Sequence, residues 1–522
     1  MNQSVTPWWQ TRVYVVLLII LAGAPFWWPA VPPLVDLPGH MGRYQVQLEI
    51  GSNPFFREYF DFQWSLIANL GIDLLVQIFG PLIGLETTIK AVVIAIPMIT
   101  VAGLLLIARE AHGRLPATAA FVLPLSIGYP LHFGFVNFSL SMGLALLAFG
   151  WWMRLDRLGK NRLRIALFVP ISISIWIVHI YGWGLLGLLV GAYEWHRTGW
   201  RRTFHAVVRC LPLALPLLMM IIWRGDASGS TSGWFKIIAK LIWLLAALRD
   251  EQYHFDIASV VTLLILPILC MGYGWWHQRR GFSTLLALAT ALIAVAYLCI
   301  PRLLLGSAFA DMRLTPFLLA IWVLTAKPKI FSRDVQYIFA TLGLAFFLLR
   351  TGMTTEHLVR LDRDFTAQLE ALPHIPRNRR IFAQINLPCQ RSWASSRMDH
   401  LSSMATVRRG AFVNDQWDMP GAQLLRIHHP QIKTWTKDPT QIARPNECPQ
   451  PQGNTYDQAM REFPRYAYDY LWLIDFTPDM LPQHDPTLTL IWQGQKSGAL
   501  YRIGSATQAS DTPTGKAPRT SQ

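Results

Sequence analysis

Residues 13–28, VYVVLLIILAGAPFWW, contain no charged side chain, and apolar blocks of similar length recur as far as residue 350. Blocks of about 16–23 residues are long enough for a helix to cross a hydrocarbon core of about 30 Å. Because no small-residue cleavage site follows the first block, we expect it to be a retained membrane anchor. The pattern predicts a polytopic α-helical membrane protein with eleven spans, at 13–30, 86–108, 116–131, 138–153, 165–179, 182–195, 207–223, 257–275, 282–300, 314–326 and 334–350.

The composition supports the same class of protein. Hydrophobic residues make up 52% of the 522 residues and charged residues only 15%, whereas soluble proteins carry about 25% charged residues. The net charge of +15 comes mostly from short loops between apolar blocks, where basic residues set the orientation of membrane helices. No basic patch interleaved with aromatic residues occurs, so we do not expect nucleic acid binding.

The basic loops indicate which ends of the helices face the cytoplasm. Short loops rich in Lys and Arg are typically cytoplasmic, which also places the N-terminus inside. Segment 64–84 is apolar enough for a twelfth span, but a span there would reverse every later loop, and Asp73 would lie at the costly bilayer centre. We therefore expect 64–84 to be an interfacial helix with Asp73 on its solvated face, within one outer loop, 31–85. The basic loops are 154–164, 196–202, 277–280 and 327–333.

The sequence changes character after residue 350, where it becomes polar and mixed in charge. We expect residues 351–505 to form a periplasmic α/β domain and residues 506–522, rich in Ser, Thr and Pro, to be a disordered tail. Cys389 and Cys448 both fall in this domain, where oxidising surroundings allow a disulfide, but the sequence leaves their pairing open. Periodicity predicts a helix at 354–372 and strands at 380–385, 469–476, 488–493 and 498–503.

The outer loop opens with VDLPGHMGRY, residues 35–44. A first helix running outward, an acidic residue opening a long outer loop, interfacial helices and a terminal outer domain resemble the GT-C glycosyltransferase superfamily, which includes aminoarabinose transferases and protein O-mannosyltransferases. The resemblance covers the layout of residues 1–350 and implies a GT-C-like transmembrane domain there. It also implies a sugar donor on a polyprenyl phosphate and a catalytic acidic residue at the position of Asp36.

The second outer loop, HFGFVNF at 132–138, departs from the family pattern because it lacks the acidic residue that many members carry there. A metal site of the paired-carboxylate kind is therefore not expected, and the sequence requires no cofactor. One alternative is a divalent ion held by Asp36 with three histidines, since imidazole and carboxylate suit zinc or manganese. Those histidines would be His40, His132 and His179.

Asp36 and His40 are the catalytic candidates. A partly desolvated carboxylate has a raised pKa and can take a proton from an acceptor hydroxyl. The alternative role is a helix cap, because Asp before a Pro in the first turn is a common N-cap. His40 and Arg43 lie at plus four and plus seven, on one face if 38–50 is helical. His40 would orient the carboxylate and Arg43 would bind phosphate, or both would belong to the polar face of an interfacial helix.

Other polar residues lie at the outer ends of predicted helices, on the same side of the membrane as Asp36. Arg313 is a candidate clamp for the lipid phosphate, and Asp311 lies beside it; a local ion pair between these two is the alternative. A lone histidine at a helix end is more often an interfacial hydrogen-bonding group than a ligand. The remaining substrate-binding candidates are His132, Asn137, His179 and Tyr181.

Together these features predict an enzyme of the bacterial inner membrane. It would move a sugar from a polyprenyl-phosphate donor to an extracytoplasmic acceptor, which is a glycan, a lipid or a protein, with Asp36 as general base. A transporter or flippase is a second class, but helix interiors almost free of charges disfavour it. A third class is a non-catalytic membrane scaffold whose outer domain binds a partner.

Overall fold

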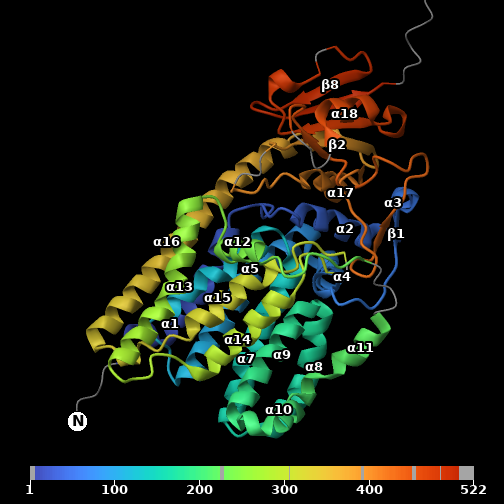
Figure 1. Cartoon of the computed structure of the whole chain (residues 1–522). Coiled ribbons are helices and arrows are strands. Elements are labelled where there is room, and N and C mark those ends of the chain that lie inside the picture. The colour runs from blue at the N-terminus through green and yellow to red at the C-terminus, as the bar shows by residue number, and fades with distance from the viewer. Residues whose placement is uncertain are drawn as a thin grey trace, which may run out of the picture.

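The computed structural model describes residues 6–223, 229–304, 306–389, 393–448, 454–482 and 484–504. A bundle of helices forms one region, and an α/β region stacks on one end of this bundle (Figure 1). The predicted tail, 506–522, lies outside the described residues.

The bundle consists of apolar helices, which supports the membrane-protein class. Within the described ranges, five helices are long and apolar enough to cross a membrane, or six if the bent pair Trp200–Arg209 and Leu211–Ile221 counts as one span. The helices that meet these criteria of length and composition are therefore fewer than the eleven predicted spans. The five are α5 (Leu85–His112), α7 (Val136–Arg157), α8 (Asn161–Val178), α13 (Tyr253–Trp276) and α16 (Arg333–Leu369).

The other helices of the bundle are shorter or more polar than a simple span. Segment 116–131 contains Pro124 and forms a 3-10 helix at Ala119–Ile127 followed by one short α-helix, because proline cannot donate the hydrogen bond of an α-helix interior. These helices are α1 (Arg12–Ala22), α6 (Tyr129–His132), α9 (Ile180–Thr198), α10 (Thr203–Arg209), α11 (Leu215–Trp223), α12 (Ile237–Leu245), α14 (Thr284–Cys299) and α15 (Thr315–Leu324).

Glycines allow α5 and α7 to approach each other closely. A Cβ atom on Gly103 of α5 would lie 2.6 Å from the backbone nitrogen of Leu147, and one on Gly143 of α7 would lie 2.7 Å from Oγ1 of Thr100. Small residues are typical of helix contacts within lipid, where apolar burial cannot by itself drive association. The two helices form part of the main buried cluster of the bundle.

A mixed β-sheet forms the core of the α/β region, in the order β6-β5-β2-β7-β9-β8, with β3 also paired to β2. β2 is parallel to β3, β5 and β7, whereas β9 is antiparallel to β7 and β8. Successive side chains of the central strands β2 and β7 are buried on both faces of the sheet, apart from the half-buried ends of β2. This is typical of a strand that is covered on both faces. The predicted α/β class and the four predicted strands are confirmed. The strands are β2 (Arg380–Asn386), β3 (Phe412–Val413), β5 (Ile442–Arg444), β6 (Asn454–Thr455), β7 (Tyr470–Ile474), β8 (Leu488–Gln493) and β9 (Ala499–Ile503), with helices α17 (Met404–Arg409) and α18 (Tyr456–Glu462).

The helix α16 joins the two regions without a break. Its 37 residues include the last predicted span, 334–350, and most of the predicted helix at 354–372, as far as Leu369, so the predicted boundary at residue 350 falls inside one helix. Arg350 is buried there and donates hydrogen bonds to Asp256 and to the carbonyl oxygen of Leu248. The connection between the bundle and the sheet is therefore a helix and not a flexible linker.

The predicted outer loop, 31–85, lies between the bundle and the sheet and forms α2 (Leu37–Glu49), α3 (Pro54–Tyr59), β1 (Phe60–Phe62) and α4 (Gly71–Ile83). Strand β1 pairs antiparallel with β4 (Leu425–Ile427), which ties the loop to the α/β region.

The prediction that Asp73 lies on a solvated face of α4 is wrong. Its side chain is fully buried and paired with Arg43 of α2, while the exposed side of α4 is apolar, with Ile78, Phe79 and Leu82. The polar side of α4 faces the protein because Arg43 supplies the compensating charge.

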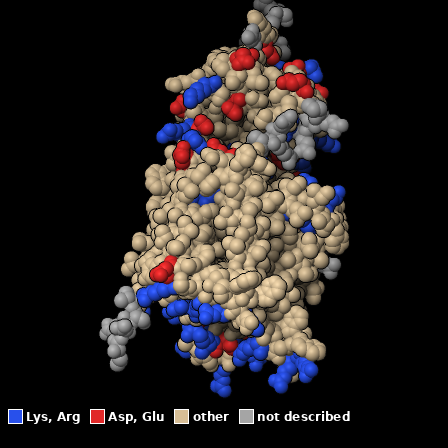
Figure 2. Space-filling model, turned by 60° about the vertical axis from the view of Figure 1, so that its left-hand side comes forward, with Lys and Arg blue, Asp and Glu red and all other residues tan. Residues whose placement is uncertain are grey.

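Charged side chains are unevenly distributed over the surface. Figure 2 shows a broad band of the bundle with few charges, whereas Lys and Arg gather at the end away from the α/β region. Helix α10 lies at that end in Figure 1. A band of this kind is what a protein surface in contact with hydrocarbon requires.

Candidate functional site

A cavity of about 670 Å³ lies where the bundle meets the α/β region. Its lining comes from the start of α2, from the segments around residues 68–69, 133–138, 179–181 and 304–313, and from four segments of the α/β region, at 387, 399–400, 417–423 and 438–444. Six of the nine candidate residues line it, namely Asp36, His40, Asn137, His179, Tyr181 and Arg313. The structure thus brings together side chains from the ends of separate helices.

Asp36 immediately precedes α2, but its side chain makes no capping hydrogen bond, so capping does not account for this residue. Its backbone nitrogen donates to the carbonyl oxygen of Phe133 at 3.0 Å. Gly134 makes this contact possible: its φ is +96°, and a Cβ atom there would lie 2.8 Å from the Asp36 nitrogen. The backbone therefore fixes Asp36 at the cavity and leaves its carboxylate free of local bonds.

The surroundings of Asp36 bring its ionisation close to neutral pH. Burial raises the pKa of Asp36 to about 7, the charges of His400 and Arg313 act to lower it, and the carboxylates of Asp399 and Asp438 act to raise it. A carboxyl group with such a pKa exchanges its proton readily at physiological pH, as a general base must.

His40 lies one turn after Asp36 and remains neutral. Burial, together with the charge of Arg43, holds the pKa of His40 well below its usual range. Its ring stacks on Tyr44 with the centroids 6.3 Å apart and contacts Trp417 edge-on at 5.2 Å. Its Nδ1 is buried without a hydrogen-bond partner among the described residues. A neutral imidazole of this kind can orient a substrate but does not supply charge.

Arg313 brings a positive charge into the cavity lining. Its guanidinium donates to Ser307 Oγ at 2.9 Å and to the carbonyl oxygen of Ala308 at 3.1 Å, and it lies 3.9 Å from the ring centroid of Phe135. In the described part of the chain, no carboxylate pairs with it within 4 Å. A positively charged group with only neutral partners is suited to bind an anion.

Asp311 does not form the alternative ion pair with Arg313. It is fully buried, accepts a hydrogen bond from the backbone nitrogen of Met312 at 2.9 Å, and lies 3.7 Å from the ammonium group of Lys240. Asp311 is therefore part of the packing behind the cavity and does not line it.

His179, Tyr181 and Asn137 combine cavity lining with structural contacts. Nδ1 of His179 accepts a hydrogen bond from the backbone nitrogen of Tyr181 at 3.2 Å, which begins α9, and the Tyr181 hydroxyl donates to the carbonyl oxygen of Ala310 at 3.1 Å. Asn137 accepts from the backbone nitrogen of Ile72 at 2.6 Å and so holds the start of α4. These residues shape the cavity wall.

His132 and Arg43 lie outside the cavity. His132 is fully buried among Asp250, whose Oδ1 is 3.8 Å from its Nε2, and Arg397, which donates to its backbone carbonyl. Arg43 is paired through both terminal nitrogens with Asp73. Both residues make structural contacts away from the cavity.

The α/β region contributes cavity residues that the sequence did not indicate: Asp399, His400, Trp417 and Asp438. Local signals existed, because 399–400 is an adjacent Asp-His pair and 414–420 reads NDQWDMP. Neither segment lies at the end of a predicted membrane helix, so the predicted topology gave no reason to place them near Asp36. Burial raises the pKa of Asp399, against the charge of His400.

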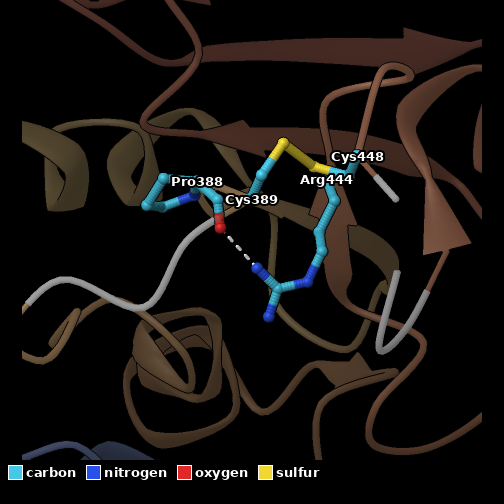
Figure 3. The surroundings of a disulfide bond; sticks show 4 residues. All are labelled: Pro388, Cys389, Arg444 and Cys448. Atoms are coloured by element: carbon cyan, nitrogen blue, oxygen red, sulfur yellow. Dashed lines mark hydrogen bonds between the residues drawn. A yellow bond between two sulfur atoms is a disulfide. The ribbon is translucent and has the colours of Figure 1, made fainter. Parts of the chain in front are cut away.

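A disulfide strengthens the rim of the cavity. Cys389 and Cys448 are bridged, which settles the pairing that the sequence left open. Figure 3 shows Arg444 beside the bridge, with its guanidinium donating to the carbonyl oxygen of Pro388. Leu387 and Arg444 both line the cavity, so the bridge joins two strand ends that form its wall.

The arrangement can bind an anion and accept a proton in one enclosed space. Among the described residues, no group of three or more His, Cys, Asp or Glu side chains is placed to hold a metal ion; Asp36, His40, His132 and His179 do not form one. No protein family model matches the chain. No curated protein matches it significantly either, so the properties of the cavity carry the functional argument.

Proposed function

We propose that the protein is a glycosyltransferase of GT-C type in the bacterial inner membrane. It moves a sugar from a polyprenyl-phosphate donor to an extracytoplasmic glycan, lipid or protein. The observation that carries the proposal is the enclosure of Asp36, whose pKa is raised to about 7, in one cavity with Arg313.

Asp36 acts as the general base in this reaction. The acceptor hydroxyl attacks the anomeric carbon of the donor sugar, and its proton passes to the Asp36 carboxylate. The bond between the anomeric carbon and the phosphate oxygen breaks, and its electron pair stays on the phosphate. Arg313 binds the phosphate and stabilises the charge that develops there. The reaction needs one base, because phosphate is already a good leaving group.

The proposed topology has eleven spans, a cytoplasmic N-terminus and a periplasmic α/β domain. Its support is the basic end of the bundle in Figure 2, which is typical of a cytoplasmic face. The disulfide Cys389–Cys448 agrees with an oxidising compartment for the α/β domain. In this topology, the remaining spans are formed by the shorter apolar helices, each together with a neighbouring helix.

The test is an Asp36→Asn substitution in the native host, with surface glycans and glycolipids profiled by mass spectrometry. Removing a general base costs about 10²–10⁴-fold in rate, so we expect the product of this enzyme to fall below detection. Asp61→Asn is the matched control, because Asp61 is an exposed carboxylate of the same outer loop.

The variant must reach wild-type abundance in the membrane for the comparison to count. Normal surface glycans with normally abundant Asp36→Asn protein would refute the proposed base, and would favour the scaffold alternative. Loss of product in Asp61→Asn as well would show that the effect does not depend on the cavity.

A further inference from the structure

A segment of the α/β region packs directly on the first turn of α2, next to Asp36. A Cβ atom on Gly39 would lie 2.5 Å from the ring of Trp417 and 3.2 Å from Cγ of His400. Nε2 of Gln416 donates to the carbonyl oxygen of Gly39 at 3.0 Å. Any larger residue at position 39 would push this segment away, so glycine permits the close contact.

The imidazole of His400 is held in one orientation. Its Nδ1 lies 3.0 Å from the backbone carbonyl oxygen of Asp415, and a carbonyl only accepts, so Nδ1 carries a proton. The Asp415 carboxylate is itself fixed by the hydroxyls of Ser402 at 2.6 Å and Ser403 at 2.8 Å. With Nδ1 engaged in this way, Nε2 is the nitrogen left for the cavity that His400 lines.

Carboxylates surround His400. Burial acts to lower its pKa, but the charges of Asp438, Asp36, Asp415 and Asp399 outweigh burial and raise the pKa of His400 above its usual value. In return, His400 is the strongest of the charges that favour the ionised form of Asp36, ahead of Arg313.

We propose that His400 is a positioning residue for Asp36: its imidazolium, held against α2 by the α/β region, favours the ionised form of the Asp36 carboxylate within the cavity. The inference rests on the proposed function for its role in catalysis. It gives the α/β region a part in the site, because that region supplies the counter-charge of the proposed base.

The experiment measures the ionisation of Asp36 without any sugar donor. The full-length protein in detergent micelles is treated at a series of pH values with N,N′-dicyclohexylcarbodiimide, which modifies protonated carboxyl groups. Mass spectrometry then quantifies the modified peptide that contains Asp36. We expect the midpoint of labelling near pH 7 in the wild type. Without the neighbouring cation, the midpoint in His400→Gln should rise by at least about one pH unit.

His429→Gln is the matched control. His429 is also a buried histidine of the α/β region, but it packs on Phe412 and Tyr468 and does not line the cavity. We expect its labelling midpoint to equal that of the wild type. His400→Lys keeps a positive charge and should return the midpoint toward the wild-type value, which a purely structural role of His400 would not explain.

A labelling midpoint in His400→Gln equal to the wild-type midpoint, at wild-type melting temperature, would overturn the inference. If His400→Gln lowers the melting temperature, Gly39→Ala serves as the second variant, because it keeps the imidazole and displaces it; an unchanged midpoint there would also count against the inference. The labelling does not depend on sugar transfer. If the labelling midpoint shifts in His400→Gln but surface glycans stay normal in Asp36→Asn, the influence of His400 on Asp36 is supported and the proposed reaction is refuted.

Discussion

Asp36 and Arg43 are seven residues apart at the start of the same helix, yet their surroundings differ. Arg43 meets a carboxylate through both terminal nitrogens, and Gln47 donates to the backbone oxygen of that same aspartate, Asp73, at 2.9 Å. Asp36 faces a cavity and makes no side-chain hydrogen bond at the helix start. The charge of Arg43 is engaged in a close ion pair, whereas the Asp36 carboxylate faces the cavity.

The difference shows how to tell structural from functional charges in this molecule. A buried ion pair joined by two hydrogen bonds, away from any cavity, serves one structural arrangement. Charged groups that share an enclosed space, have perturbed ionisation and form no close ion pair are candidates for function. Asp36 and Arg313 belong to the second kind, and Arg43 and Asp73 belong to the first.

The largest expected effect on stability tests the structural pair. Asp73→Asn leaves the Arg43 guanidinium buried without a counter-charge, and breaking a buried pair costs about 3–5 kcal/mol. We expect a lower free energy of unfolding, followed by tryptophan fluorescence of the detergent-solubilised protein. Asp61→Asn, an exposed control, should change it little. Equal stability of Asp73→Asn and the wild type would mean that the Arg43–Asp73 pair, like the charged groups of the cavity, does not stabilise the fold.

A smaller effect is expected at the rim of the cavity. The disulfide closes a loop with a sequence separation of 59 residues, and removing a bridge of this kind costs about 2–4 kcal/mol. The double variant Cys389→Ser, Cys448→Ser should therefore unfold at a lower temperature. Because the bridge touches neither Asp36 nor His400, carbodiimide labelling of Asp36 should keep its midpoint; a moved midpoint would mean that the rim also sets the ionisation of the site.

The smallest effect concerns pH and Asp36 itself. The folded pKa of about 7 exceeds the unfolded value of about 3.9, so between these values the folded protein holds a proton that the unfolded chain has released. Stability from this group is therefore complete below pH 4 and is lost as the pH rises toward 7. Asp36→Asn has no such group, so its free energy of unfolding should exceed that of the wild type by about 1–2 kcal/mol as the pH rises toward 7. This difference is smaller than the full pKa shift implies, because the cavity admits water. Parallel pH profiles of the two unfolding free energies would contradict this.

Much of the cavity could be predicted from the sequence because helix ends are tied to membrane faces. Apolar block lengths and basic loops placed Asp36, His179 and Arg313 on one side, and the structure brings these residues into one cavity. The strands of the α/β region followed from runs of β-branched and aromatic residues, as at 488–493.

The remaining features depend on pairings between distant segments, which local patterns do not encode. The prediction for Asp73 is wrong because its partner, Arg43, lies 30 residues away in the sequence. His400 and Asp438 reach Asp36 only through the packing of the 399–417 segment on α2 and the parallel alignment of β2 with β5. Residue 350 looked like a boundary because composition changes there, although helix geometry continues through it.

The length of α16 has a mechanical consequence. A helix of 37 residues is about 55 Å long at 1.5 Å per residue, and this one is anchored along its course: Arg350 binds Asp256, and His357 lies 2.7 Å from Asp250. A swing of the α/β region would have to bend this rod or break both anchors. This continuous helix and its two anchors therefore oppose a swing of the α/β region against the bundle. If the proposed function holds, the substrates would have to reach the cavity through rearranged loops and side chains.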